Sequence, residues 1–294
     1  MLPLVTIAIP TYNRPALLKR ALDCVYRQSY PNIEVLIADN CSPGNEVSRA
    51  IDAYRDKLPN LKYIKHAENI GSINNCFSLL DRANGKYFMW LADDDEISPN
   101  YVLTLTQLLE DNPDAATAAG HWVLMLSENR RRCMPTTSLP QHSSIMRAAR
   151  FIWKADDAFF YGLHRTALLR KATFSGYWWP NQNELFNWAY VFLFDMVLIG
   201  RVLLPHDKSV QFINHDYTAK NYSIQRNKAK GLFMYFARRI NVHFLYLVKV
   251  KRMLGPIIVV PMFVVSSASI LREFSLFFGG VVYRKMSRLV RWIL

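Results

Sequence analysis

Apolar and polar positions form two different patterns along the first hundred residues, one typical of strands and the other of helices. Four short stretches are rich in β-branched, aliphatic or aromatic residues and end at polar or turn residues, which is typical of buried strands. They cover residues 4–9, 33–38, 61–65 and 86–92. Helically spaced apolar positions separate them, as in the segment from Leu17 to Val25. Strands that alternate with helices in this way predict an α/β fold with a parallel, doubly wound sheet.

Polar side chains follow each predicted strand at once. They stand at residues 11–13, 39–40, 69 and 93–95. In an open α/β sheet, ligands bind outside the carboxyl ends of the strands, so we expect these side chains to line one crevice. No Gly-x-Gly-x-x-Gly or Walker-type loop follows the first strand, which argues against a dinucleotide or ATP site.

Three adjacent carboxylates, Asp93, Asp94 and Asp95, are the most informative residues at this edge. Like charges repel one another, and a hard divalent cation such as Mg²⁺ or Mn²⁺ takes oxygen ligands and often bridges to phosphates. The alternative is a solvated acidic loop before a helix that begins at Ser98 and Pro99. The sequence therefore predicts either a cation site or an exposed loop.

Four motifs in a fixed order resemble family 2 glycosyltransferases with the GT-A fold. They are VTIAIPTYNR (residues 5–14), VLIADN (35–40), ENIG (68–71) and LADDDEISP (91–99). Later segments fit more loosely, namely FYGLHR (160–165), GRVLLP (200–205) and a late His215 followed by Ser223. The resemblance implies a Rossmann-like, mostly parallel central sheet with helices on both faces.

The resemblance also implies a nucleotide-sugar donor. Asp39 would meet the base edge, Asp93 would reach the ribose or the sugar, and Asp95 would hold a divalent ion, Mn²⁺ or Mg²⁺, between the two phosphates. His215 is the expected late ligand of the ion or the diphosphate. The expected donor-binding residues are Pro10, Thr11, Tyr12, Arg14, Asp39, Asn69, Asp93 and Asp94. Many family members carry an Asp where Ala92 stands here, so the assignment among the three carboxylates is open.

The catalytic base is the least determined site residue. An inverting transferase, as the resemblance implies, needs a carboxylate within hydrogen-bond reach of the acceptor hydroxyl. Glu184 is the nearest acid to the position where the family supplies it, although it could equally stabilise the first turn of a helix. Asp156 and Asp157 are the alternatives. Asp195 lies in an apolar helical stretch, and we expect it to pair with a neighbouring residue.

The charge distribution divides the chain of 294 residues. Residues 220–294 hold fourteen Lys or Arg and a single acid, Glu273, so they carry the whole net charge of +13, and residues 1–219 are formally neutral. We therefore expect a catalytic domain at 1–219 and a basic, apolar helical region at 220–294. Four cysteines without a Cys-x-x-Cys spacing suit reduced thiols, and Cys24 and Cys76 fall on apolar helix patterns.

The apolar residues of the basic region 220–294 distinguish a membrane from a nucleic acid as its binding partner. A nucleic-acid surface would not need this density of Leu, Val and Phe, so no nucleic acid is expected. Basic residues mixed with apolar ones suit an anionic membrane surface, bound in plane. Residues 253–271 are just long enough for a transmembrane span, and a buried hairpin or an oligomer interface is the remaining alternative.

The triplet Arg130–Arg132 is a second concentration of positive charge. Its surroundings read as a loop, in which the arginines are either simply exposed or meet an acceptor phosphate. Residues 121–126, before it, are predicted as a strand.

These features together predict a glycosyltransferase of surface-polysaccharide assembly, such as an O-antigen or capsule. The first strand starts by residue 4 with no signal peptide before it, so we expect the cytoplasmic face of the inner membrane, with monotopic or peripheral attachment. A polyprenyl-diphosphate-linked saccharide is the expected acceptor. The alternatives are a non-catalytic nucleotide-sugar-binding or scaffold subunit, because the expected pair of acids at the base is missing, and a nucleotidyltransferase.

Overall fold

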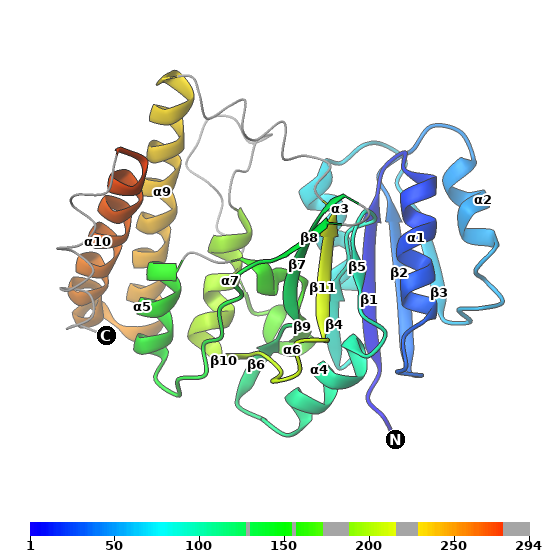
Figure 1. Ribbon diagram of the computed structural model, residues 1–294, viewed down its shortest axis with the longest axis horizontal. Coiled ribbons are helices and arrows are strands. Elements are labelled where there is room, and N and C mark those ends of the chain that lie inside the picture. The colour runs from blue at the N-terminus through cyan, green and yellow to red at the C-terminus, as the bar shows by residue number, and fades with distance from the viewer. Residues whose placement is uncertain (128–129, 155–156, 173–187, 216–228, 279–294) are drawn as a thin grey trace. The chain divides into compact units, whose positions relative to one another are not determined.

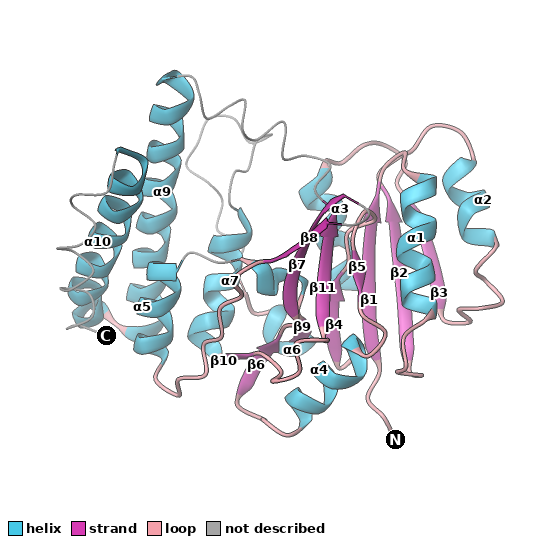
Figure 2. Cartoon of the chain, in the orientation of Figure 1, coloured by secondary structure: helices cyan, strands magenta, loops and turns pink. Residues whose placement is uncertain are grey.

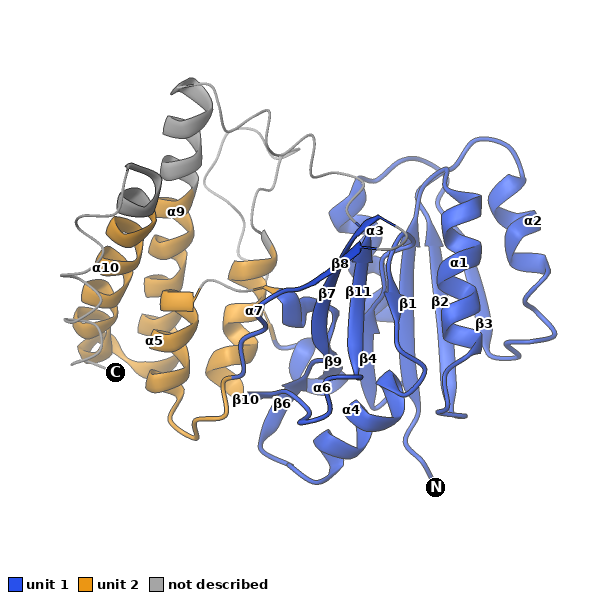
Figure 3. Cartoon of the chain, viewed as in Figure 1, with its two compact units in different colours: residues 1–138, 158–171, 202–216 blue, residues 139–157, 172–201, 217–294 orange. Residues whose placement is uncertain are grey.

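The chain forms two compact units (Figure 3). The computed structural model describes residues 1–127, 130–154, 157–172, 188–215 and 229–278. Unit 1 comprises Met1–Ser138, Ala158–Lys171 and Val202–Asp216, and unit 2 comprises Leu139–Asp157, Ala172–Arg201 and Tyr217–Leu294. Unit 2 thus takes in two internal segments besides the C-terminal region. The boundary predicted between residues 219 and 220 lies outside the described residues, and the division into domains stays a prediction.

Unit 1 is built on a seven-stranded, mostly parallel sheet (Figures 1 and 2). In spatial order the strands are β10 (Arg201–Leu203), β6 (Ala115–Ala118), β9 (Leu163–Arg165), β4 (Tyr87–Trp90), β1 (Val5–Thr11), β2 (Ile33–Asp39) and β3 (Leu61–Lys65). β1 pairs in parallel with β2 and β4, and β2 pairs in parallel with β3, whereas β9 runs antiparallel to β4 and β6. The predicted α/β fold with a mostly parallel sheet is confirmed.

The strand order decides which helices share a face. The chain steps outward from β1 to β2 to β3 through α1 (Pro15–Tyr26) and α2 (Glu46–Asp52), and it then returns past β1 to β4 through α3 (Ser72–Arg82). Because parallel crossovers are right-handed, α1 and α2 lie on one face and α3 on the other. Helix α1 buries Leu18, Ala21, Leu22 and Val25, the stripe that its sequence spacing predicted.

A second, four-stranded sheet completes unit 1, in the order β5 (Glu96–Ile97), β11 (Gln211–His215), β7 (His121–Ser127) and β8 (Arg130–Cys133). The strand predicted at residues 121–126 is confirmed as β7. The segment GRVLLP, which resembles a family motif, contains β10. The loop predicted around Arg130–Arg132 is wrong, because these residues form strand β8 and pair antiparallel with β7. Helix α4 (Tyr101–Glu110), η1 (Ala158–Tyr161) and α6 (Thr166–Leu169) complete the elements of this unit.

Apolar side chains from both halves of unit 1 form one core. Val5, Ile7, Val35 and Ile37 from the first strands are fully or almost fully buried in it, together with Tyr87. Burial of this apolar surface is the main driving force for the fold. Cys24 and Cys76 are buried, as predicted, and the high pKa values that burial gives their thiols, about 12 for Cys24, keep them unreactive.

Unit 2 is helical in its described part, with α5 (Ser144–Lys154), α7 (Trp188–Ile199), α9 (Ala229–Leu254), η2 (Pro256–Ile258) and α10 (Val259–Phe278). Asp195 of the apolar helix α7 forms a buried ion pair with Lys249 of α9, Oδ2 to Nζ at 2.7 Å, which confirms the pairing expected for it. The buried Arg147 of α5 donates to the carbonyls of Val197 and Leu198 and so caps the end of α7.

One segment of unit 2, Pro256–Glu273, is long and apolar enough to cross a membrane, by length and composition alone. Only 28% of it is buried within the protein. Much of its apolar surface is therefore open to another partner.

Candidate active site

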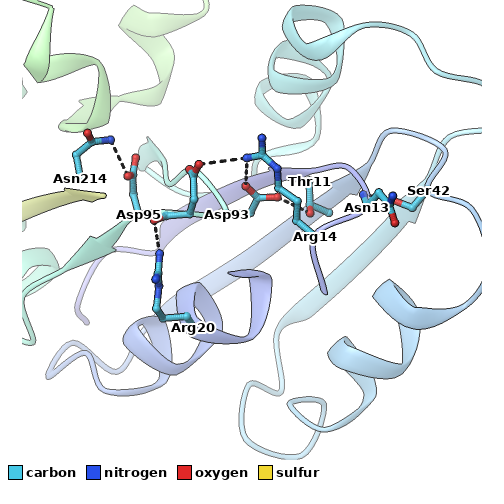
Figure 4. A network of polar contacts seen from close by, with 9 residues as sticks. Thr11, Asn13, Arg14, Arg20, Ser42, Asp93, Asp95 and Asn214 are labelled. Atoms are coloured by element: carbon cyan, nitrogen blue, oxygen red, sulfur yellow. Dashed lines mark hydrogen bonds and ion pairs between the residues drawn. The ribbon is translucent and has the colours of Figure 1, made fainter. Parts of the chain in front are cut away.

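The parallel strands bring their polar ends together at one edge of the large sheet. Thr11, the last residue of β1, is in register with Asp39, the last residue of β2. Asp93 follows β4 by three residues, and its Oδ2 accepts a hydrogen bond of 2.7 Å from the Thr11 hydroxyl (Figure 4). The structure therefore joins the first and fourth predicted motifs, 82 residues apart, through a direct contact.

Arg14 is a cation whose side chain contacts two carboxylates of the acidic turn. It immediately precedes α1, and its Nη1 lies 3.3 Å from Asp93 Oδ1 and 3.1 Å from Asp94 Oδ2 (Figure 4). Asp93 is 4% exposed. Burial raises the pKa of Asp93, and the Thr11 hydrogen bond and the Arg14 charge oppose that rise. The guanidinium of Arg14 is half-exposed, so it is also accessible to a phosphate group, with which it would form charge-assisted hydrogen bonds.

Asp95 is the most deeply buried of the three carboxylates, at 1% exposure. Its Oδ1 accepts a hydrogen bond of 2.8 Å from the Asn214 amide of β11, whereas its Oδ2 has no hydrogen-bond partner among the described residues (Figure 4). Burial, and then the charge of Asp94, raises the pKa of Asp95 to about 8. A buried carboxylate oxygen without a partner is costly, and a bound cation would remove that cost.

The burial of Asp93 and Asp95 argues against the solvated acidic loop. The helix after the acidic turn begins at Tyr101, with Asn100 as its N-terminal cap residue, and not at Ser98. The carboxylates therefore do not serve to cap it.

His215 lies on the strand that pairs with β5, next to the acidic turn, but its ring has a different partner. Its Nε2 is 3.0 Å from Glu96 Oε1, and the same carboxylate oxygen is 3.2 Å from Arg20 Nε. The described residues contain no group of three or more His, Cys, Asp or Glu side chains arranged to hold a metal ion. A magnesium-type ion usually takes only one or two carboxylates and completes its shell with substrate phosphates, so the orphaned Asp95 oxygen fits such an ion.

Asp39 is fully buried and holds the loop that follows β2. Its Oδ1 accepts hydrogen bonds from the Ser42 amide at 2.8 Å and the Ser42 hydroxyl at 2.5 Å, and its Oδ2 accepts one from the Tyr63 hydroxyl at 2.8 Å. Burial and the neighbouring Asp39 carboxylate raise the pKa of Tyr63. The Ser42 hydroxyl in turn accepts from the Asn13 amide (Figure 4). This network links the loops after β1 and β2, and contact of Asp39 with a base stays a prediction.

The other predicted donor residues lie around the same edge. Asn69 accepts hydrogen bonds from the Asn40 side chain at 2.8 Å and from the Gly71 amide at 3.0 Å, and so it orders the turn before α3. Tyr12 is 47% exposed, and Pro10 is half-buried. Both lie at the carboxyl end of β1.

Sequence reasoning missed Ser42, Tyr63, Glu96 and Asn214. Ser42 follows Asp39 by three residues, a spacing that permits a local side-chain to backbone turn and would have been a detectable signal. Asn214 of β11 and Tyr63 of β3 reach their aspartates from other segments of the sequence, and no local pattern marks them.

The expected catalytic base is not placed. Glu184 and Asp156 lie outside the described residues, and Asp157 is half-buried in unit 2. Their roles stay predictions.

The profile described as Glycosyl transferase family 2 matches residues 6–173, more than half of the chain. The chain belongs to glycosyl transferase family 2. The matched region of this family 2 chain contains the whole acidic turn, Thr11, Arg14 and Asp39.

Curated relatives agree with the family. The putative colanic acid biosynthesis glycosyl transferase WcaA of Escherichia coli K12 is 36% identical over 99 residues, which is 33% of this chain and 35% of the relative. The GalNAc(5)-diNAcBac-PP-undecaprenol β-1,3-glucosyltransferase of Campylobacter jejuni is 23% identical over 63% of this chain and 59% of its own length. The chain thus spans less than two thirds of the length of these relatives.

Solved structures share the fold of the family 2 chain. The structure of S. aureus TarS 1–349 in complex with UDP is 17% identical, with a TM-score of 0.66, over 92% of this chain and 72% of that one. The mannosyltransferase PcManGT from Pyrobaculum calidifontis, in complex with GDP-Man and Mn²⁺, is 15% identical, with a TM-score of 0.56, over 100% of this chain and 85% of that one. At such identities the likeness concerns the fold, and it agrees with the predicted GT-A type.

Proposed function

We propose that this family 2 protein is a glycosyltransferase that moves a sugar from a nucleotide-diphosphate sugar to a lipid-linked saccharide acceptor. The observation that carries the proposal is the buried acidic turn at the carboxyl edge of the sheet, with one oxygen of Asp95 lacking a partner among the described residues. The TarS and PcManGT complexes with UDP and with GDP-Man and Mn²⁺ support a nucleotide-sugar donor and a divalent ion. The names of the two curated relatives support a polyprenyl-diphosphate acceptor and polysaccharide assembly.

The chemistry follows from the leaving group. Glycosyl transfer releases a nucleoside diphosphate, and a divalent ion held by Asp95, with His215 as a second candidate ligand, would stabilise the negative charge of this leaving group. Mn²⁺ and Mg²⁺ both suit these ligands. The hydrogen bond from the Thr11 hydroxyl holds the Asp93 carboxylate in one orientation. The carboxylate oxygens keep lone pairs that can accept hydrogen bonds from hydroxyl groups of the nucleotide-sugar. Arg14, which lies beside Asp93 and Asp94, would add a further positive charge next to the diphosphate.

Inversion of configuration and a general base at Glu184 rest on the resemblance alone. A base must lie within hydrogen-bond reach of the acceptor hydroxyl. Glu184→Gln would test the assignment, because a base variant loses turnover while it keeps its affinity for the donor.

A thermal-shift panel on the detergent-solubilised protein tests the donor site. It would compare UDP-, GDP-, dTDP- and CDP-sugars, each with Mn²⁺ and with EDTA. Ligands that bind the native state raise the unfolding temperature by mass action, so we expect a metal-dependent rise for one nucleotide class. No rise with any donor would contradict the proposal. Release of nucleoside diphosphate would identify a transferase rather than a binding subunit, and release of pyrophosphate would identify a nucleotidyltransferase.

We further propose peripheral or monotopic attachment of unit 2 to the cytoplasmic face of the inner membrane. Helix α9 exposes Ile240, Phe244 and Val248, which are spaced four residues apart and so lie on one face, and Ile257 and Phe263 are exposed after it. The single acid of the region, Glu273, already pairs with the buried Arg239. The remaining basic excess favours an anionic bilayer and disfavours a second copy of the same surface.

Vesicle flotation tests this attachment. We expect the full chain to float with phosphatidylglycerol-containing vesicles and to bind pure phosphatidylcholine vesicles much more weakly. The double variant Phe244→Gln and Phe263→Gln should lose at least about ten-fold in binding, because each buried Phe side chain contributes roughly 1.5–3 kcal/mol. Tyr26→Gln, which changes an exposed aromatic residue of unit 1, is the control. Undiminished binding of the double variant would contradict the assignment of this face.

A further inference from the structure

Strand β8 presents three consecutive arginines at the edge of the four-stranded sheet. Arg130, Arg131 and Arg132 are all exposed, and β8 pairs only with β7 in that sheet. Their side chains form no ion pair or hydrogen bond with another described residue. Figure 2 shows β8, β7 and β11 side by side. Three cations are thus concentrated on one strand without any acid to neutralise them in the part of the chain that is described.

The register of the sheet connects one of these arginines with the acidic turn. Arg132 is opposite Leu124 of β7, and Leu124 is opposite Asn214 of β11. Asn214 is the residue that hydrogen-bonds to Asp95. Residues opposite one another across a sheet point to the same face, so Arg132 shares a face with Asn214. Two strand spacings, about 9.6 Å, separate their backbones.

Arg131 occupies the other face. It is opposite Met125, which is opposite His215, and the His215 ring contacts Glu96 rather than Asp95. Because successive side chains of a strand alternate between faces, Arg130 returns to the face of Arg132. The strand therefore has two arginines on the side of Asn214 and one on the opposite side.

The chemistry of this face suits phosphate. A guanidinium presents paired N–H donors that match phosphate oxygens in a bidentate way, and it keeps its charge at any physiological pH. Charged residues on an edge strand also serve simply to prevent pairing with another sheet. That role depends on charge at the edge and makes no distinction between the two faces, so the two explanations predict different results for Arg131 and Arg132.

We propose that Arg130 and Arg132 bind the diphosphate of a lipid-linked acceptor and so hold the acceptor saccharide beside the donor carboxylates. The proposal rests on the proposed transferase function and deepens it. Asn214, Leu124 and Arg132 lie in register across β11, β7 and β8. The proposal assigns the donor diphosphate to the end of this register next to Asp95, and the acceptor diphosphate to the end on β8.

Binding of farnesyl diphosphate, a short lipid diphosphate, to the full detergent-solubilised chain tests the proposal, with farnesol as the probe that lacks phosphate. Arg132→Gln should weaken farnesyl diphosphate binding about ten-fold, since a charge-assisted hydrogen bond contributes on this scale. Arg131→Gln removes the same charge from the same strand but from the opposite face, and it should change the affinity less than about two-fold. Unfolding temperatures would confirm that both variants are folded.

Each other outcome overturns the inference. Equal losses in both variants would mean non-specific attraction, and no loss in either would leave the arginines as protection of the edge strand. Failure of the wild type to bind farnesyl diphosphate more tightly than farnesol would also overturn it. Binding of nucleoside diphosphate in Mn²⁺ is measured separately for the wild type and Arg132→Gln. If Arg132→Gln lost affinity for nucleoside diphosphate as well, strand β8 would bind the donor and not the acceptor. Absence of nucleoside diphosphate binding in the wild type would count against the proposed function itself.

Discussion

Asp95→Asn should abolish the metal-dependent stabilisation by nucleotide-sugar donors and lower turnover by about 10³-fold or more, comparable to the loss of an electrostatic group that stabilises a leaving charge. The substitution keeps the volume of the side chain and an oxygen that can accept from Asn214. It replaces a charged cation ligand with a neutral amide. Turnover and thermal shift in Mn²⁺ and in EDTA would measure the effect.

The same variant should be at least as stable as the wild type without ligands. The Asp95 carboxyl is buried, it lies beside Asp94, and its Oδ2 has no hydrogen-bond partner among the described residues, so its pKa is raised to about 8. Ionisation of Asp95 as the pH rises through that value costs folding free energy, a cost that the neutral amide of Asp95→Asn avoids. Asp56→Asn, at an exposed carboxylate of unit 1, is the control and should change neither property. Full turnover of Asp95→Asn in Mn²⁺ would rule out Asp95 as the ion ligand.

Lys249→Met should destabilise unit 2 by about 3–5 kcal/mol, because it removes a buried cation that lies 2.7 Å from the buried carboxylate of Asp195. Lys249 and Asp195 are 2% and 1% exposed, and burial lowers the pKa of Lys249. Arg252, another described cation beside this carboxylate, is half-exposed, and its Nη2 is 3.5 Å from Asp195 Oδ1. Urea denaturation would measure the loss.

Two further variants test whether the loss of stability comes from the buried Lys249–Asp195 ion pair or from removing any positive charge from the helix. Lys251→Met changes an exposed lysine on the same helix, and it should cost less than about 0.5 kcal/mol. The double variant Asp195→Leu with Lys249→Met should recover most of the lost stability, since replacing both members of a buried pair by apolar residues is often neutral. A double variant as unstable as Lys249→Met alone would show that the cavity and packing, rather than the unpaired charge, dominate.

Local patterns were sufficient for the elements of unit 1. The β-branched runs became β1, β2 and β3, and the polar residues that follow them lie at one edge because parallel strands align their carboxyl ends. The helical stripe at residues 17–25 became the buried face of α1. These predictions succeeded because strand and helix periodicities are properties of neighbouring residues.

The same reasoning failed where periodicity is absent. Three consecutive arginines show no alternation of apolar and polar positions, so Arg130–Arg132 read as a loop although pairing with β7 makes them a strand. An edge strand that is exposed on both faces needs no apolar side, and only its partner strand defines it.

Tertiary structure also decided which charges are buried and which partners they meet. The triplet of carboxylates is visible in the sequence, but the burial of Asp95 and its contact with Asn214, 119 residues later, depend on the pairing of β5 with β11. Likewise, the sequence marked Asp195 as an acid in an apolar helix, and the fold supplied Lys249 from 54 residues away. The residue types alone determined which chemistry is available to this protein. Long-range packing determined the free energy of each charged side chain, because that energy depends on how much solvent and which partners surround the charge in the folded protein.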